Sequence, residues 1–183
     1  MAHKNQNKTV GRAAQTAQIQ RMALMGMLFA ATLVLTALEN QLQIPVPVPG
    51  VKLGLSNIVV MYSLFFLKKR DAFLLAVMKA LFVFLTRGAI AAVLSLCGGL
   101  LSILVMVIFQ YLFKDKISYL MVSILGAVFH NIGQIIAVSI LYTGLFLWSY
   151  TPVLLISGIA AGAATSTLLK ITLPALQKAH FRD

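Results

Sequence analysis

Long apolar runs separated by short polar breaks are the main pattern along this chain. Runs such as 22–38 and 88–113 are longer and more apolar than a soluble core helix needs, and they match the roughly 20 residues that cross a bilayer. The pattern predicts six transmembrane helices at about Arg21–Leu38, Leu55–Leu67, Ala72–Thr86, Gly88–Phe113, Ile117–Leu141 and Leu145–Leu169. The second is short unless it extends back into its polar start. The tight break at 86–88 predicts an antiparallel hairpin between the third and fourth helices.

These runs predict an all-α integral membrane protein built as a single bundle of six transmembrane helices. We expect residues 1–20 to form an N-terminal tail, residues 21–170 the substrate-binding bundle and residues 171–183 a C-terminal tail. The polar stretch before the first run is too long for a typical cleaved signal peptide, which favours a retained first span.

Composition supports the membrane interpretation. Hydrophobic residues make up 60% of the chain and charged residues 10%, and the mean hydropathy is +0.94. The formal charge of +11 could indicate nucleic-acid binding, but the cations lie at the ends of apolar runs rather than in one patch, which argues against that class. The single Cys97 excludes a disulfide framework within the chain.

The positions of the cations predict the orientation, because cytoplasmic loops carry an excess of Lys and Arg. With both termini cytoplasmic, all but three of the 15 cations lie inside. The inside set is Lys4, Lys8, Arg12, Arg21, Lys68, Lys69, Arg70, Lys114, Lys116, Lys170, Lys178 and Arg182. The exceptions are Lys52, Lys79 and Arg87.

A polar, proline-punctuated segment, Glu39–Asn57, joins the first two predicted helices on the outer side. Pro45, Pro47 and Pro49 alternate with aliphatic residues, which predicts an extended loop rather than a helix. A membrane protein poor in charge places its one glutamate and a lysine here, so we expect a functional segment. Its candidate binding residues are Glu39, Asn40, Lys52 and Asn57.

Two further cations fall on the third predicted helix. Lys79 lies at its middle, where an ammonium costs roughly 2.5–3.5 kcal/mol on insertion scales, and Arg87 follows about two turns later, near the same face. In one interpretation Lys79 snorkels and Arg87 anchors the interface. In the other, an outward-facing cavity with surplus positive charge binds an anionic or electron-rich small molecule.

The fifth predicted helix carries a second polar cluster, His130, Asn131 and Gln134. Such side chains inside a bilayer face a neighbouring helix or a cavity, since lipid offers them no partner. Hydrogen bonding between helices and ligand binding explain them equally well. As a metal site the cluster is weak, because it has one histidine and no second ligand nearby.

Small residues indicate close helix packing. Gly26 and Ala30 lie four apart on the first helix, and either pack within the bundle or dock a partner subunit. Gly98 and Gly99 predict a bend or a close crossing in the fourth helix.

Three segments resemble the bacterial Gx transporter family, which also carries the label heptaprenyl diphosphate synthase component I. They are LENQLQIPVPVPGVKLGLSNIV (38–59), KALFVFLTRGAIAAVLSLCGGLLSILVM (79–106, with Met78 where the family usually has leucine) and GAVFHNIGQ (126–134). The likeness covers most of residues 20–170. The family is grouped with the substrate-binding S components of energy-coupling factor (ECF) transporters, which are six-helix proteins of the bacterial cytoplasmic membrane.

The resemblance implies that the chain captures a vitamin-like molecule from outside. The proline segment would be the lid, and Gly26 and Ala30 part of the face that docks a transmembrane coupling subunit. Paired ATPases would drive uptake, since the chain has no Walker A motif. The other family label supports an alternative, a non-catalytic membrane subunit of polyprenyl diphosphate or quinone synthesis, or of a quinone-linked electron-transfer assembly.

We expect no enzymatic activity and no cofactor. A prenyl diphosphate synthase holds magnesium diphosphate with several clustered carboxylates, whereas Asp71, Asp115 and Asp183 are widely separated. A solitary secondary transporter stays open, although six unrepeated short spans are a modest basis for alternating access.

Overall fold

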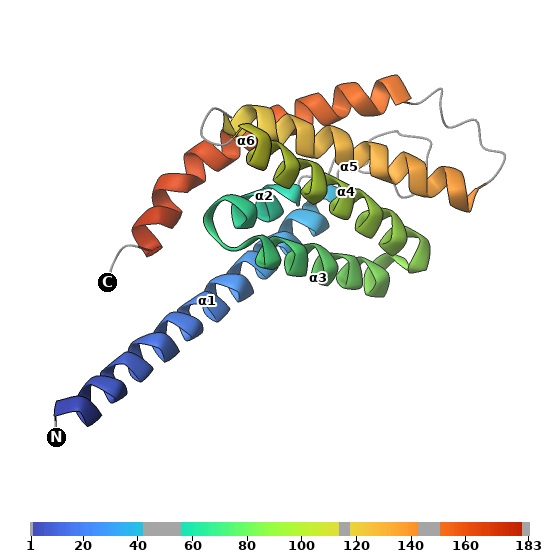
Figure 1. Cartoon of the computed structure of the whole chain (residues 1–183). Coiled ribbons are helices and arrows are strands. Elements are labelled where there is room, and N and C mark those ends of the chain that lie inside the picture. The colour runs from blue at the N-terminus through green and yellow to red at the C-terminus, as the bar shows by residue number, and fades with distance from the viewer. Residues whose placement is uncertain (1, 42–55, 114–117, 143–150, 181–183) are drawn as a thin grey trace.

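The computed structural model describes residues 2–41, 56–113, 118–142 and 151–180. These ranges form six helices, and no residue in them is a strand (Figure 1). The helices are α1 (Ala2–Gln41), α2 (Asn57–Phe66), α3 (Lys69–Arg87), α4 (Ala89–Phe113), α5 (Tyr119–Leu141) and α6 (Thr151–His180). The all-helical prediction is therefore confirmed for the described part of the chain.

Three segments are long and apolar enough to cross a membrane: Gln18–Glu39 within α1, all of α4 and all of α5. They identify a membrane-type helical protein. α3 is 19 residues long but carries too many charged residues to belong to this group. α2 has ten residues and rises about 15 Å, half of a typical 30 Å hydrocarbon core. The six-span topology and its orientation stay predictions.

The predicted helix limits agree closely with α2 to α5 and differ for the two terminal helices. α1 begins at Ala2, so the predicted N-terminal tail is helical, and α6 continues to His180, past the predicted end at Leu169. The first six residues of the predicted sixth span, 145–150, lie outside the described residues.

α2 is the centre of the bundle. It contacts each of the other five helices, and every residue from Asn57 to Leu64 is buried. α3, α4, α5 and α6 pack in sequence order, whereas α1 contacts α2 and α3 and its N-terminal half extends away from the bundle (Figure 1). The large side chains that are most deeply buried include Met61, Leu75, Leu94 and Met106. Polar groups on α2 therefore face protein on all sides.

α3 and α4 form the predicted tight hairpin. Gly88 alone separates them, with a φ of 86° that a side chain would strain. The two helices then pack along one another.

α4 crosses α5 closely at two glycines, as predicted for Gly98. A Cβ on Gly98 would lie 2.8 Å from the carbonyl oxygen of His130 and 2.9 Å from its Nδ1. A Cβ on Gly133 would lie 2.9 Å from the carbonyl oxygen of Cys97. Glycine at both positions thus lets α4 lie directly against the imidazole.

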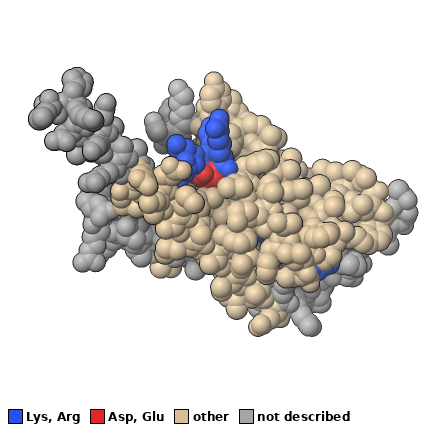
Figure 2. Space-filling view, turned by 90° about the horizontal axis from the view of Figure 1, so that it is seen from below, with Lys and Arg blue, Asp and Glu red and all other residues tan. Residues whose placement is uncertain are grey.

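An ion pair ties α1 to α3. Arg21 donates to both carboxylate oxygens of Asp71, and the backbone N–H of Lys68 donates to the same carboxylate at 3.2 Å. Burial alone would raise the pKa of Asp71, but these hydrogen bonds outweigh it and hold the pKa below its ordinary value. In the view from below in Figure 2, one acidic patch lies between Lys and Arg side chains, and most of the other coloured surface belongs to uncharged residues.

Candidate functional site

Four helices bring charged and polar side chains together inside the bundle. Glu39 comes from α1, Asn57 from the first turn of α2, Lys79 from the middle of α3, and His130 and Gln134 from α5. Each is buried, with 2–8% of its surface exposed. We call these five residues the Lys79 cluster.

Lys79 links the members of the cluster. Its Nζ donates to Oδ1 of Asn57 at 3.3 Å, and it interacts electrostatically with Glu39 and with His130. Its side chain is 6% exposed, so the ammonium lies within protein rather than snorkelling to an interface. Of the two interpretations of Lys79, this burial supports the one that places it inside the protein.

The imidazole of His130 lies between Gln134 and α4. Nε2 of His130 and Nε2 of Gln134 are 3.3 Å apart. An amide nitrogen only donates, so in this orientation His130 accepts at Nε2 and carries its proton on Nδ1. That Nδ1 lies beside Gly98 but makes no hydrogen bond of good geometry within the described residues.

Several polar atoms of the cluster have no hydrogen-bond partner among the described residues. They are Nδ2 of Asn57, Nδ1 of His130 and Oε1 of Gln134. Buried polar atoms are nearly always paired, because an unpaired one costs about 1–3 kcal/mol. A water or a ligand beside these atoms would complete their hydrogen bonding.

Asn131 has a different role from its neighbours. Its Nδ2 donates to the carbonyl oxygen of Leu154 at 2.8 Å and thereby ties α5 to α6. Ser123 makes a similar bond, donating to the carbonyl oxygen of Gly162 at 2.7 Å. For Asn131, the structure supports hydrogen bonding between helices.

The other predicted site residues lie elsewhere or outside the described part. Arg87 is exposed at the end of α3, although it was predicted near the face of Lys79. Lys52 is outside the described residues, as is the rest of the predicted lid from 42 to 55, and the side chain of Asn40 is not described. Gly26 and Ala30 are exposed, and nothing lies within 4 Å of a Cβ built on Gly26. Among the described residues, neither residue of this pair is covered by another helix.

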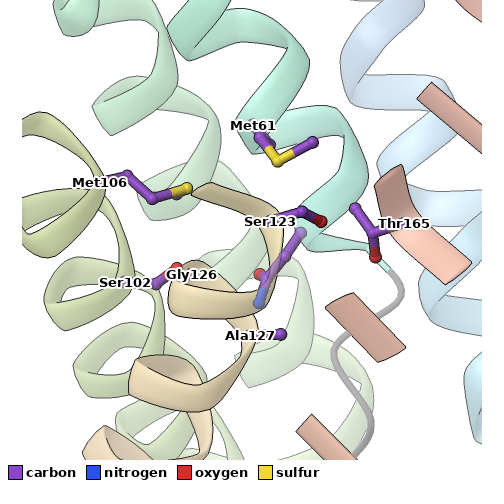
Figure 3. A pocket seen from close by; sticks show the side chains of 8 residues that line it. Met61, Ser102, Met106, Ser123, Gly126, Ala127 and Thr165 are labelled. Atoms are coloured by element: carbon purple, nitrogen blue, oxygen red, sulfur yellow. The ribbon is translucent and has the colours of Figure 1, made fainter. Parts of the chain in front are cut away.

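A small cavity adjoins the cluster at Asn57 (Figure 3). Serine, threonine and methionine side chains from α2, α4, α5 and α6 point toward it, and it offers about 10 Å³ to a water-sized sphere, room for about one water molecule. Its lining consists of Asn57, Met61, Ser102, Met106, Ser123, Gly126, Ala127 and Thr165. Apart from Asn57, sequence reasoning missed these residues, because isolated small polar residues in apolar helices give a weak signal.

The described residues offer charge and hydrogen bonding rather than metal chemistry. Within them, no three His, Cys, Asp or Glu side chains gather where they could hold a metal ion. The arrangement presents a buried ammonium beside several hydrogen-bonding side chains.

Comparison with known proteins identifies a family. A family model described as heptaprenyl diphosphate synthase component I matches residues 28–172, which is well over half of the chain. No curated protein and no solved structure matched. The chain belongs to the heptaprenyl diphosphate synthase component I family.

Proposed function

We propose that this member of the heptaprenyl diphosphate synthase component I family is a ligand-binding membrane subunit, which captures a small molecule from the outer side for ECF-type uptake. In this proposal the Lys79 cluster binds the molecule and residues 40–56 cover it. A coupling subunit and paired ATPases supply the energy. The protein works in the bacterial cytoplasmic membrane.

One observation carries the proposal: the proline segment starts and ends at the cluster. Glu39 immediately precedes residues 40–56 and Asn57 immediately follows them, and both interact with Lys79. Whatever path the segment takes, its two ends are anchored beside the same buried ammonium. A loop fixed in this way is suited to close over a molecule bound at Lys79.

The energetics favour a binding role over a purely structural one. A buried ammonium is costly, and an apolar residue of similar size would stabilise the bundle as well or better. The cluster also leaves three polar atoms without partners in the described residues. Buried groups that weaken folding are typical of sites where a ligand supplies the missing interactions.

The family description supports a second candidate, a non-catalytic membrane subunit of polyprenyl diphosphate synthesis. In that role the protein would bind a lipid-like intermediate or a catalytic partner. The chain has four acidic residues in all, and the two that are described, Glu39 and Asp71, each interact with a cation. This arrangement fits the non-catalytic form of the candidate.

Two experiments on the full chain separate these functions. The first is native mass spectrometry of protein extracted from its own membrane. We expect a bound small molecule, lost in Lys79→Ala and Glu39→Ala and kept in the matched cation control Arg87→Ala. The second is co-expression with ECF coupling and ATPase subunits, where we expect a stable complex.

The outcomes divide cleanly. A complex with a prenyl diphosphate synthase subunit, and none with the coupling subunits, would favour the second candidate. Retention of the bound molecule by Lys79→Ala would refute the site. The uptake proposal would be contradicted if the protein retained no small molecule and formed no complex with the coupling subunits.

A further inference from the structure

One hydrogen-bonding side chain from each of four helices lines the small cavity next to the Lys79 cluster. They are Asn57 from α2, Ser102 from α4, Ser123 from α5 and Thr165 from α6, each with 2–8% of its surface exposed. Figure 3 shows Ser102 on one side of the cavity and Thr165 on the other. The space of about 10 Å³ for a water-sized sphere is room for one water molecule.

Two of these four side chains have an unpaired polar atom. Lys79 donates to Oδ1 of Asn57 at 3.3 Å, and because an ammonium only donates, the amide must turn its Nδ2 away from Lys79. Neither this Nδ2 nor Oγ of Ser102 makes a hydrogen bond with the other or with any other group in the described part of the chain. Both residues line the same cavity, so a molecule inside it can serve both.

The other two hydroxyls have already used their hydrogens. Oγ of Ser123 donates to the carbonyl oxygen of Gly162 at 2.7 Å, and Oγ1 of Thr165 donates to the carbonyl oxygen of Ala161 at 2.7 Å. A hydroxyl oxygen that donates keeps two lone pairs, so both oxygens can still accept. The cavity thus presents one amide donor, two acceptors and one hydroxyl that can act as either.

These groups match a water molecule better than an ion. Water donates two hydrogen bonds and accepts two, so it can satisfy all four groups at once. A cation would face the N–H of Asn57, and a chloride would find two hydroxyl oxygens whose hydrogens are bonded elsewhere. Buried waters in proteins typically make about three hydrogen bonds to groups that would otherwise be unpaired.

We propose that this cavity binds one ordered water molecule, which accepts hydrogen bonds from Asn57 and Ser102 and donates to the two remaining hydroxyls. The water links α2 to α4, α5 and α6. It also holds the amide of Asn57 in the orientation in which its oxygen faces Lys79. This inference is independent of the proposed function, because it requires no ligand at the Lys79 cluster.

The first test is X-ray footprinting of the detergent-purified full chain. Radiolysis of a trapped water produces a hydroxyl radical, which oxidises the side chains beside it, and methionine reacts readily. Met61 and Met106 line the cavity and are each 1% exposed, so they are shielded from radicals formed in the solvent. Mass spectrometry should find both oxidised in the wild type, with the exposed Met121 as the reference for dose.

Gly126→Ala should remove most of this oxidation. Its Cβ would lie 3.3 Å from Oγ of Ser102 and 2.7 Å from Sδ of Met106, and both residues line the cavity, so the methyl group takes the place of the water. Only the end of a flexible methionine side chain has to move, so we expect the variant to fold. The inference is overturned if Met61 and Met106 stay unoxidised in the wild type while Met121 reacts. Oxidation at the wild-type level in folded Gly126→Ala would overturn it as well.

The second test compares Ser102→Ala with the matched variant Ser95→Ala in unfolding by SDS. Ser95 lies about two turns away on α4 and is also buried without a partner among the described residues, but it does not line this cavity. Removal of an unpaired buried hydroxyl relieves its desolvation, so Ser95→Ala should unfold at the same SDS fraction as the wild type or at a higher one. Ser102→Ala loses a bond to the water and should unfold at a lower fraction. If the two variants are equally stable, Ser102 does not bond to a water and the inference fails.

Discussion

Alanine at Gly98 should destabilise the bundle and disturb the Lys79 cluster, whereas alanine at the adjacent Gly99 should not. A Cβ on Gly98 would lie 2.8 Å from the backbone oxygen of His130, a distance at which α4 and α5 must move apart. A Cβ on Gly99 would lie 3.7 Å from Cβ of Ala76, an ordinary contact. The two substitutions are identical in chemistry and differ only in the face of α4 on which they fall.

The magnitudes follow from these distances. Overpacking at a tight contact costs about 1–3 kcal/mol, and replacing glycine by alanine within a helix stabilises by roughly 0.5–1 kcal/mol. We therefore expect Gly98→Ala to lower the free energy of unfolding by about 1–2 kcal/mol and Gly99→Ala to raise it slightly. The difference between the variants should be about 2 kcal/mol.

The assay is reversible unfolding of the purified protein in mixed micelles with increasing SDS, followed by far-UV circular dichroism. Ligand retention measured on the same samples tests the second consequence, because the imidazole of His130 lies against Gly98. Equal stability of the two variants would refute the close crossing. A destabilised Gly98→Ala that retains its ligand at the wild-type level would refute the link between this crossing and the site.

Three further predictions follow from the described contacts. Glu39→Gln and Lys79→Gln should each lower the free energy of unfolding by about 3 kcal/mol, and the double variant should lower it by clearly less than the sum of the two. Additive losses in the same SDS assay would show that the two side chains are not coupled. The carboxylate of Asp71 has a lowered pKa, so its bond to Arg21 stabilises the fold above the ordinary value of 3.8 and is lost as the pH falls through the lowered value. Between pH 7 and pH 3, the free energy of unfolding of the wild type should fall at the acid end, and that of Asp71→Asn should fall less. Parallel pH profiles of the two proteins would contradict this. Asn131→Leu should lower the free energy of unfolding by about 1–2 kcal/mol, because its hydrogen bond to α6 is lost. An unchanged free energy of unfolding would contradict that contact.

Periodic apolar runs were enough to predict most of the fold. The hairpin at Gly88 was predicted from the tight break at 86–88, and the close crossing at Gly98 was one of the two alternatives that the glycine pair indicated. The ends of α1 and α6 could not be predicted in the same way. Before Arg21 the helix continues through polar sequence, and past Leu169 it continues through Pro174, a residue type that normally ends or kinks a helix.

The structure brings some of the candidate site residues together and places Arg87 away from them. Glu39, Lys79 and His130 were found because ionisable residues are rare in apolar helices, and the structure brings them together. Arg87 is eight residues from Lys79, but eight residues exceed two turns by about 80°, so one side chain is buried and the other exposed. Spacing along one helix could not reveal which face the neighbouring helices cover.

The central position of α2 explains how so short a helix can organise the site. A ten-residue helix ends well short of the bilayer thickness, so its first turn, at Asn57, lies inside the bundle instead of at its surface. There the side-chain oxygen of Asn57 accepts a hydrogen bond from the buried ammonium of Lys79, which also interacts electrostatically with Glu39 near the C-terminal end of α1.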